Sequence, residues 1–183
     1  STIDIVIEAS TDKTTLCNFT NHSYFNLDGT KNIANHQLMV ECDKVLPVDE
    51  NGIPISGPIF AKDLDLDFKT GRTLNNNGNP IEVDHNFCIS NTRQNLRRNA
   101  FVTAKNVSLE LFSTEPGLQV YTGKGLNSGN EKIWGKYPYR EFAGIALEPQ
   151  IWPDAPNQID FPNPLLQPGD MYKHHTRLKF SRS

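Results

Sequence analysis

Residues 107–122 read VSLELFSTEPGLQVYT, and this stretch decides the class of fold. Over residues 107–114, most apolar side chains alternate with polar ones, which is typical of a β-strand with one buried face. Pro116 and Gly117 then supply a turn signal, and residues 118–122 resume the strand pattern. Two strands follow one another here with no room for a helix between them.

The same pattern recurs along the chain. Ile3, Ile5 and Ile7 fall on one side of an extended chain and Thr2, Asp4, Val6 and Glu8 on the other, so residues 2–8 predict a half-buried strand at the start of the chain. Further strands are expected at residues 14–20, 36–41, 44–48, 85–90, 144–147 and 172–180. No window of a dozen residues keeps a helical apolar stripe. The sequence therefore predicts a single all-β domain, an antiparallel sandwich or barrel.

Composition narrows the function classes. With 183 residues and 37% hydrophobic content, the chain is long and apolar enough for one domain with a sizeable core. It carries 18 basic and 21 acidic residues, and its one adjacent basic pair, Arg97-Arg98, is interpreted as a solvated turn. Nucleic acid is therefore not an expected partner. No stretch has the apolar length that a membrane-spanning helix requires, so no membrane partner is expected either.

The cysteines indicate a reducing compartment. Cys17, Cys42 and Cys88 are odd in number and widely spaced, which fits neither a disulfide framework nor a zinc site. We expect reduced and mostly buried thiols, a cytoplasmic location and no bound metal. His174-His175 lies on the last predicted strand, where successive side chains diverge, so a solvated edge is expected there rather than a metal pair.

Three polar segments are candidates for chemistry. In residues 20–29, His22 stands among Thr, Asn and aromatic residues that can fix one tautomer, although a lone His is more often structural. In residues 83–87, Asp84 and His85 are adjacent on a predicted strand and point to opposite faces, so at most one of them lines a site. A turn-capping role for Asp84 is an equal alternative.

The third segment, residues 144–157, contains the strongest candidate. An apolar strand is predicted to end at Glu148, which is followed by Pro149. A carboxyl group at the end of a buried strand is partly desolvated, and this raises its pKa and suits a general base. Glu148 is therefore expected to be functional.

Taken together, the motifs resemble a known family. They are TNHSYFNL at residues 20–27, DHNF at 84–87, TEPGLQVYT at 114–122, LEPQ at 147–150 with PDAPN at 153–157, and LQPGDMY at 166–172. Their order and spacing are similar to those of the aldose 1-epimerase (galactose mutarotase) family over about residues 1–180. The resemblance implies a large antiparallel β-sandwich, the galactose mutarotase-like supersandwich. Residues 1–183 would form its C-terminal portion.

The resemblance also implies roles for four residues and no cofactor or metal. By motif position, His22 is the general acid and Glu148 the general base, while Asp84 and Gln119 bind sugar hydroxyls. The implied reaction interconverts the α and β anomers of a free hexose such as galactose or glucose. Because the base must be ionised while the acid is protonated, we expect a bell-shaped pH profile.

Family members also carry an N-terminal half with an Asn-Arg pair and a second His at the sugar site. The resemblance does not extend to such a segment here, so we expect it in the same or another polypeptide, for example in a fusion with a sugar-nucleotide epimerase. A non-catalytic or incomplete sugar-binding domain is the alternative. A glycosidase using Asp84 and Glu148 as paired carboxylates ranks last. An epimerase of sugar phosphates is disfavoured because no compact cluster of basic residues adjoins the motifs.

Overall fold

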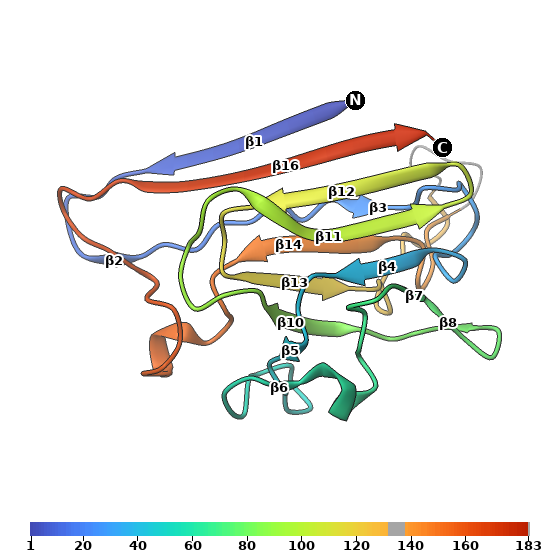
Figure 1. The fold of residues 1–183 in the computed structure, drawn as a ribbon, viewed down its shortest axis with the longest axis horizontal. Helices are drawn as coiled ribbons and strands as arrows, with labels where there is room; N and C mark the ends of the chain where they lie inside the picture. The colour runs from blue at the N-terminus through green and yellow to red at the C-terminus, as the bar shows by residue number, and fades with distance from the viewer. Residues whose placement is uncertain (132–137, 183) are drawn as a thin grey trace.

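Two six-stranded antiparallel sheets form the body of the protein in the computed structural model, which describes residues 1–131 and 138–182 (Figure 1). The first sheet has the order β1 (Thr2–Ala9), β16 (Tyr172–Arg182), β12 (Val107–Ser113), β11 (Arg97–Ala104), β4 (Gln37–Val40) and β7 (Arg72–Thr73). The second has the order β3 (Tyr24–Phe25), β14 (Ile145–Gln150), β13 (Gly117–Tyr121), β10 (Asp84–Cys88), β5 (Lys44–Val45) and β6 (Ile59–Phe60).

Smaller elements complete the fold. Two-stranded ladders join β15 (Leu165–Leu166) to β2 (Thr15–Leu16) and β8 (Asn75–Asn76) to β9 (Asn79–Pro80). Within residues 1–131 and 138–182, the helical elements are two short 3-10 turns, η1 (Ala61–Leu64) and η2 (Ala155–Asn157). In the ranges that the structure describes, no helix has the length and apolar character needed to cross a membrane.

The core lies between the two sheets. Leu38, Val102 and Leu109 of the first sheet and Phe87 and Leu118 of the second are fully buried in one apolar cluster. Side chains alternate between faces along each strand, so each sheet turns one apolar face inward and one mixed face outward. This arrangement confirms the prediction of an all-β antiparallel sandwich.

The stretch at residues 107–122 connects the two layers. β12 lies in the first sheet between β16 and β11, whereas β13 lies in the second sheet between β14 and β10. The bend around Pro116 therefore carries the chain from one layer of the sandwich to the other (Figure 1). β1 agrees with its prediction in part, because Ile5 and Ile7 are half-buried and their neighbours are exposed, whereas Ile3 is exposed as well.

Two local predictions were wrong. The strand expected at residues 14–20 is limited to the two residues of β2, and residues 17–23 belong to no sheet. Arg97-Arg98, interpreted as a turn, begins β11 instead. The Arg98 Nε donates to Glu41 Oε1 at 2.6 Å, and the Arg98 Nη1 donates to Glu110 Oε2 at 3.4 Å. Acidic partners from β12 and from the residue just after β4 thus stabilise Arg98 at a strand position.

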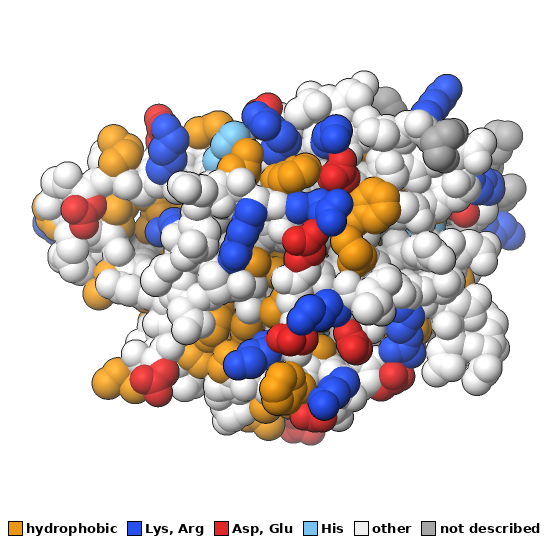
Figure 2. Space-filling model, viewed as in Figure 1, with side chains coloured by type: hydrophobic (Ala, Val, Ile, Leu, Met, Phe, Trp, Pro, Cys, Tyr) orange, Lys and Arg blue, Asp and Glu red, His pale blue; other side chains and the backbone are white. Residues whose placement is uncertain are grey.

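Basic and acidic side chains are interleaved on the face shown in Figure 2. Ion pairs on the first sheet account for part of this pattern, since Glu110 is shared by Arg98 and Lys179. Such a face has no extended field of one sign, which agrees with the low net charge.

Candidate active site

The outward face of the second sheet gathers the predicted site residues. In the antiparallel register, Glu148 of β14 stands opposite Gln119 of β13, and Gln119 stands opposite Asn86 of β10. The neighbouring row is formed by Tyr24, Ala146, Tyr121 and Asp84. Because side chains two apart on a strand share a face, these residues lie together on the side away from the core.

His22 and Glu148 meet at one edge of this face. The His22 Nδ1 lies 3.6 Å from Glu148 Oε1. The His22 side chain is 55% exposed, whereas that of Glu148 is 10% exposed. The imidazole ring stacks on Tyr24 with 5.0 Å between ring centroids, which limits its orientation.

His22 and Glu148 are far apart in the sequence, and they converge because segment 17–23 runs alongside β14. The proximity of the two groups therefore depends on the tertiary fold and cannot be predicted from local sequence.

Burial controls the charge state of the base candidate. Desolvation raises the pKa of the Glu148 carboxyl above its ordinary value; the positive charge of His22 opposes this shift and the negative charge of Asp84 adds to it. A raised pKa makes a carboxylate a stronger proton acceptor. A neighbouring cation keeps that carboxylate ionised until it accepts the proton. This is the property expected of a general base.

A second polar pair lies across the same face. The Gln119 Nε2 donates to Asp84 Oδ1 at 2.7 Å, which orients both side chains. Among the described residues, buried Gln119 Oε1 and Asn86 Oδ1 have no hydrogen-bond partner. Buried polar atoms normally have one, so these oxygens are suited to accept hydrogen bonds from hydroxyl groups. Asp84 is two strands away from Glu148, roughly 10 Å across the sheet.

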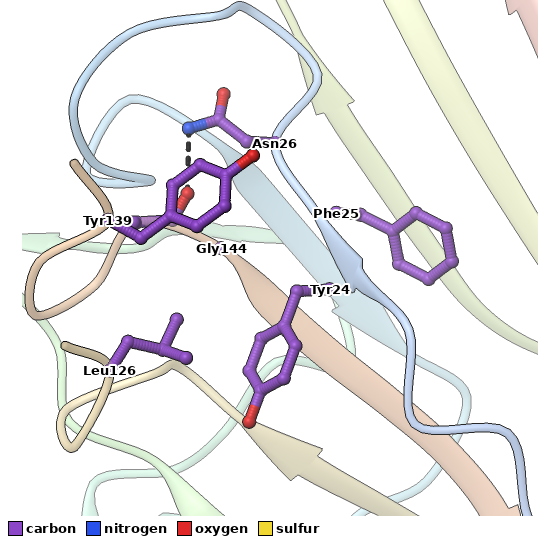
Figure 3. A pocket seen from close by; sticks show the side chains of 7 residues that line it. Tyr24, Phe25, Asn26, Leu126, Tyr139 and Gly144 are labelled. Atoms are coloured by element: carbon purple, nitrogen blue, oxygen red, sulfur yellow. Dashed lines mark hydrogen bonds between the residues drawn. The ribbon is translucent and has the colours of Figure 1, made fainter. Parts of the chain in front are cut away.

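Aromatic side chains border the polar groups. Tyr24 and Tyr121 form an edge-to-face pair with centroids 6.2 Å apart, and the Tyr121 hydroxyl accepts a hydrogen bond from Gly125 N at 2.6 Å. Beyond Tyr24 lies a cavity of about 290 Å³ (Figure 3). Its wall includes Leu126 and Tyr139. One side of the site is thus apolar and aromatic.

The other end of the face is closed by Trp152. Its indole Nε1 donates to Pro116 O at 3.1 Å, and its ring packs against Gly117. A Cβ atom on Gly117 would lie 2.8 Å from Trp152 Cδ1 and 2.5 Å from Asn86 Oδ1. Glycine is required here because backbone and indole approach so closely.

The structure brings all four predicted site residues, His22, Glu148, Asp84 and Gln119, to one face. It separates His85 from them, since His85 points to the opposite side of β10. One expectation was wrong in detail: Glu148 lies within β14, which continues to Gln150, rather than at a strand end. The desolvation that was expected at a strand end comes instead from neighbouring strands.

Sequence reasoning missed Tyr121 and Asn86 as site-facing residues and gave Tyr24 no role of its own. The period of two was the available signal, because Asn86 is two residues from Asp84 and Tyr121 is two residues from Gln119. For Tyr24, the signal was its position two residues after His22. The same parity would have marked all three.

The expectation for His174-His175 was half wrong. His175 is partly exposed, but His174 is 1% exposed and lies in a polar network. Burial lowers the pKa of His174. In the part of the chain that the structure describes, no group of three or more His, Cys, Asp or Glu side chains could hold a metal ion.

Comparisons with known proteins identify the family. The family model described as Aldose 1-epimerase matches residues 1–179. The chain is 40% identical to galactose mutarotase of Homo sapiens, covering 94% of this chain and 52% of that protein. It is 34% identical to aldose 1-epimerase of Escherichia coli (strain K12), covering 97% of this chain and 54% of that protein. The chain thus spans about half the length of the curated relatives it matches.

A solved structure shows the same fold. The crystal structure of the GalM/aldose epimerase homologue from C. elegans superposes with a TM-score of 0.88 at 27% identity. The match covers 99% of this chain and 56% of that one. The sandwich described above is therefore similar to about half of that structure.

Proposed function

Because this chain belongs to the aldose 1-epimerase family, we propose that its outer-face site interconverts the α and β anomers of a hexose such as galactose or glucose. The proposal covers the reaction, the substrate and the roles of the residues. It rests on one observation above all, the approach of His22 Nδ1 to within 3.6 Å of Glu148 Oε1.

The chemistry of the acetal centre explains why this spacing matters. The C1 hydroxyl oxygen and the ring oxygen of a pyranose are bonded to the same carbon. An acid and a base that serve these two oxygens therefore need to converge on this one carbon. His22 and Glu148 are spaced for this task, and each positioned acid or base contributes roughly 10²–10⁴ in rate.

In the proposed reaction, the Glu148 carboxylate removes the proton from the C1 hydroxyl. The His22 imidazolium delivers a proton to the ring oxygen as the bond between C1 and that oxygen breaks. The open aldehyde rotates about the C1–C2 bond. Reclosure returns both protons and gives the other anomer, so the reaction is balanced without a redox change.

Other groups on the face are proposed to hold the sugar. Asp84 and the free oxygen of Gln119 would accept hydrogen bonds from ring hydroxyls, which are good donors. Tyr24 and Tyr121 would contact the apolar face of the sugar. Fixing the ring in this way places its acetal centre beside the acid and base.

The rest of the sugar site is proposed to come from polypeptide outside these residues, in the same or another chain. We also propose a cytoplasmic location within hexose metabolism. Cys17, Cys42 and Cys88 are free and buried, which supports a reducing environment.

Polarimetry tests the proposed function. Freshly dissolved α-galactose is expected to lose optical rotation faster with the full natural polypeptide that carries these residues than without it. The variant His22→Asn is expected to remove the acceleration. Binding of galactose by calorimetry without any acceleration by the unmodified protein would instead identify a non-catalytic sugar-binding domain.

A further inference from the structure

The segment that carries His22 has no backbone ladder of its own. Residues 17–23 belong to no strand or helix, yet His22 must stay beside Glu148 for the proposed reaction. An irregular segment needs other contacts to fix its position. Besides the bond from Cys17 N to Pro164 O at 2.8 Å, those contacts involve side chains at Asn18 and around Phe19.

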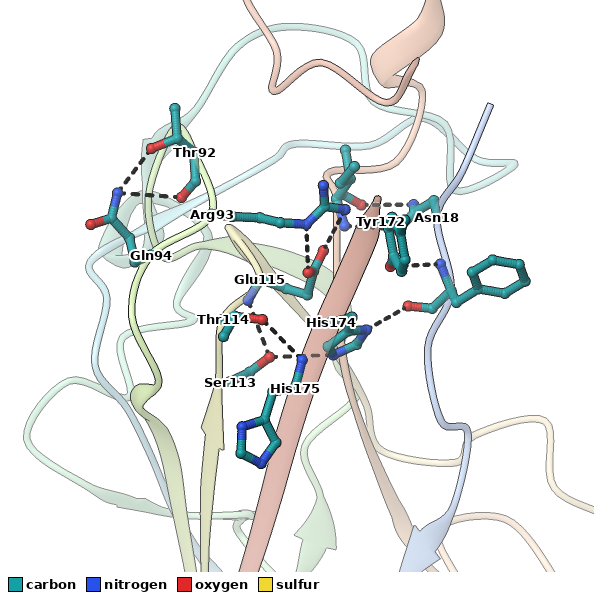
Figure 4. A network of polar contacts seen from close by, with 12 residues as sticks. Asn18, Thr92, Arg93, Gln94, Ser113, Thr114, Glu115, Tyr172, His174 and His175 are labelled. Atoms are coloured by element: carbon teal, nitrogen blue, oxygen red, sulfur yellow. Dashed lines mark hydrogen bonds and ion pairs between the residues drawn. The ribbon is translucent and has the colours of Figure 1, made fainter. Parts of the chain in front are cut away.

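Asn18 joins the segment to the chain just beyond β14. The Asn18 Nδ2 donates to Ile151 O at 3.1 Å, and Ile151 N donates to Asn18 Oδ1 at 2.9 Å (Figure 4). An asparagine side chain offers one donor and one acceptor in the arrangement of a peptide group. Asn18 therefore makes the two bonds that a neighbouring strand would make with Ile151.

Side chains of β16 form hydrogen bonds with both the backbone N–H and the backbone C=O of Phe19. Phe19 N donates to the Tyr172 hydroxyl at 3.3 Å, and His174 Nδ1 lies 3.1 Å from Phe19 O. Since a carbonyl can only accept, His174 Nδ1 carries the proton. His174 Nε2 then accepts from the Thr176 hydroxyl at 2.7 Å. Burial, which lowers the pKa of His174, favours this neutral form.

An ion pair supports Tyr172 from the other side. Arg93 lies over the Tyr172 ring at 4.4 Å from its centroid and donates from Nε to Glu115 Oε1 at 2.7 Å (Figure 4). Glu115 has no exposed surface. The contacts that fix Phe19 are thus part of a buried network rather than an isolated bond.

These anchors bracket Glu148. Asn18 attaches the segment at Ile151, and the ladder between Tyr24 and Ala146 attaches it again on the other side of Glu148. Pro149 lies on the same edge of β14 as Ile151 and has no N–H group, so it cannot donate a hydrogen bond there. His22 thus lies in a bridge whose two ends are fixed to the strand that carries the base.

We propose that Asn18 is a positioning residue that sets the spacing between His22 and Glu148 by pairing with the backbone of Ile151. The inference rests on the proposed function for its kinetic consequences. Asn18 itself is exposed, so water can replace its two bonds when it is removed. Its loss is expected to change the geometry of the acid and base more than the stability of the fold.

Steady-state kinetics of the variant Asn18→Ala test the inference. We expect kcat to fall roughly 10- to 100-fold, because misplacement of a catalytic group by about 1 Å has this cost. KM should change little, since Asp84 and Gln119 lie on strands that Asn18 does not contact. The control is Asn75→Ala, which removes a turn bond to Gly78 N in the separate β8–β9 hairpin and should leave kcat unchanged.

A second readout does not need activity. His22 lowers the pKa of Glu148, so His22→Asn is expected to raise that pKa, as followed by carboxyl ¹³C NMR. In an Asn18→Ala background, the same substitution should have a smaller effect. An equal effect in both backgrounds, or an unchanged kcat in Asn18→Ala, would overturn the inference.

The two proposals can fail separately. If the unmodified protein does not accelerate mutarotation but the NMR effect of His22→Asn depends on Asn18, the proposed function is overturned and the positioning role is supported. If Asn18→Ala does not fold, Asn18→Asp takes its place, because it keeps the oxygen that accepts from Ile151 N and removes the donor to Ile151 O. It should lower kcat several-fold at constant KM, and an unchanged kcat would overturn the inference.

Discussion

The outer faces of the two sheets follow the same alternation of side chains, but the pKa values of their carboxyl groups are shifted in opposite directions. On the first sheet, Glu110 lies between Lys179 at 2.8 Å and Arg98 at 3.4 Å. The hydrogen bond from Lys179, aided by Arg98, lowers the pKa of Glu110. On the second sheet, burial raises the pKa of Glu148, and its neighbour at 3.6 Å is His22.

This difference separates structural charge from reactive charge. A carboxylate between two permanent cations at the surface stays ionised and has little chemistry. A desolvated carboxylate accepts a proton more readily than a surface carboxylate does, because burial disfavours its charged form. The face with fewer compensated charges is therefore the one that we assign to catalysis.

The largest expected effect distinguishes these two carboxylates. Glu148→Gln should lower kcat for mutarotation by about 10²–10⁴, because an amide cannot accept the proton from the C1 hydroxyl. Glu110→Gln is the matched control on the other face and should keep kcat unchanged. Polarimetry with α-galactose measures both, and similar rates for the two variants would contradict the assignment of the face.

The next effect concerns two arginine–carboxylate pairs. Arg93→Met leaves Glu115 without its partner although that carboxyl group has no exposed surface, so the free energy of unfolding should fall by about 3 kcal/mol. Arg98→Met removes only partly exposed pairs with Glu41 and Glu110 and should cost about 0.5–1 kcal/mol. Denaturant unfolding compares them, and equal losses would show that burial of Glu115 has no influence.

The sequence predicted the fold well because strands have a local signal. Alternation located β1, β12 and β16, and the same period of two correctly assigned Asp84 and His85 to opposite faces of β10. Arg97-Arg98 was misinterpreted because the acidic partners of Arg98, Glu110 of β12 and Glu41 just after β4, come from distant parts of the sequence. Charge on a strand is recognisable only when its cross-strand neighbours are known.

The candidate site was predicted less completely, for a related reason. Family motifs pointed to His22 and Glu148, but their approach depends on the contact of Asn18 with Ile151, which no local pattern contains. His174 was expected at a solvated edge because the sequence does not show that Phe19 lies over it. Long-range side-chain contacts of this kind are visible only in the folded chain.

A smaller expected effect, on KM, distinguishes a role in sugar binding from a role in the chemical step. Asp84→Asn should raise KM about 10-fold with little change in kcat, because it weakens a charge-assisted hydrogen bond that is present before and during the reaction. Glu41→Gln, which alters a carboxylate of the first sheet, should leave KM unchanged. Initial rates over a range of galactose concentrations measure both, and a fall in kcat at constant KM for Asp84→Asn would contradict the binding role.

The smallest effect is on the pH dependence of stability, and it has opposite signs on the two faces. Glu148 has a raised pKa in the folded protein, so its contribution to stability is complete below the unfolded pKa and is lost as pH rises through the folded pKa. Glu148→Gln should therefore stabilise the protein at neutral pH, on the order of 1 kcal/mol.

Glu110 has a lowered pKa in the folded protein, so its contribution is present above the unfolded pKa and is lost as pH falls through the folded pKa. Glu110→Gln should therefore destabilise the protein at neutral pH by about 0.5 kcal/mol. Both differences should close in acid, where the two carboxyl groups are protonated in the unmodified protein. Urea unfolding at several pH values measures them, and a stability loss in both variants at neutral pH would mean that Glu148 serves the fold as Glu110 does.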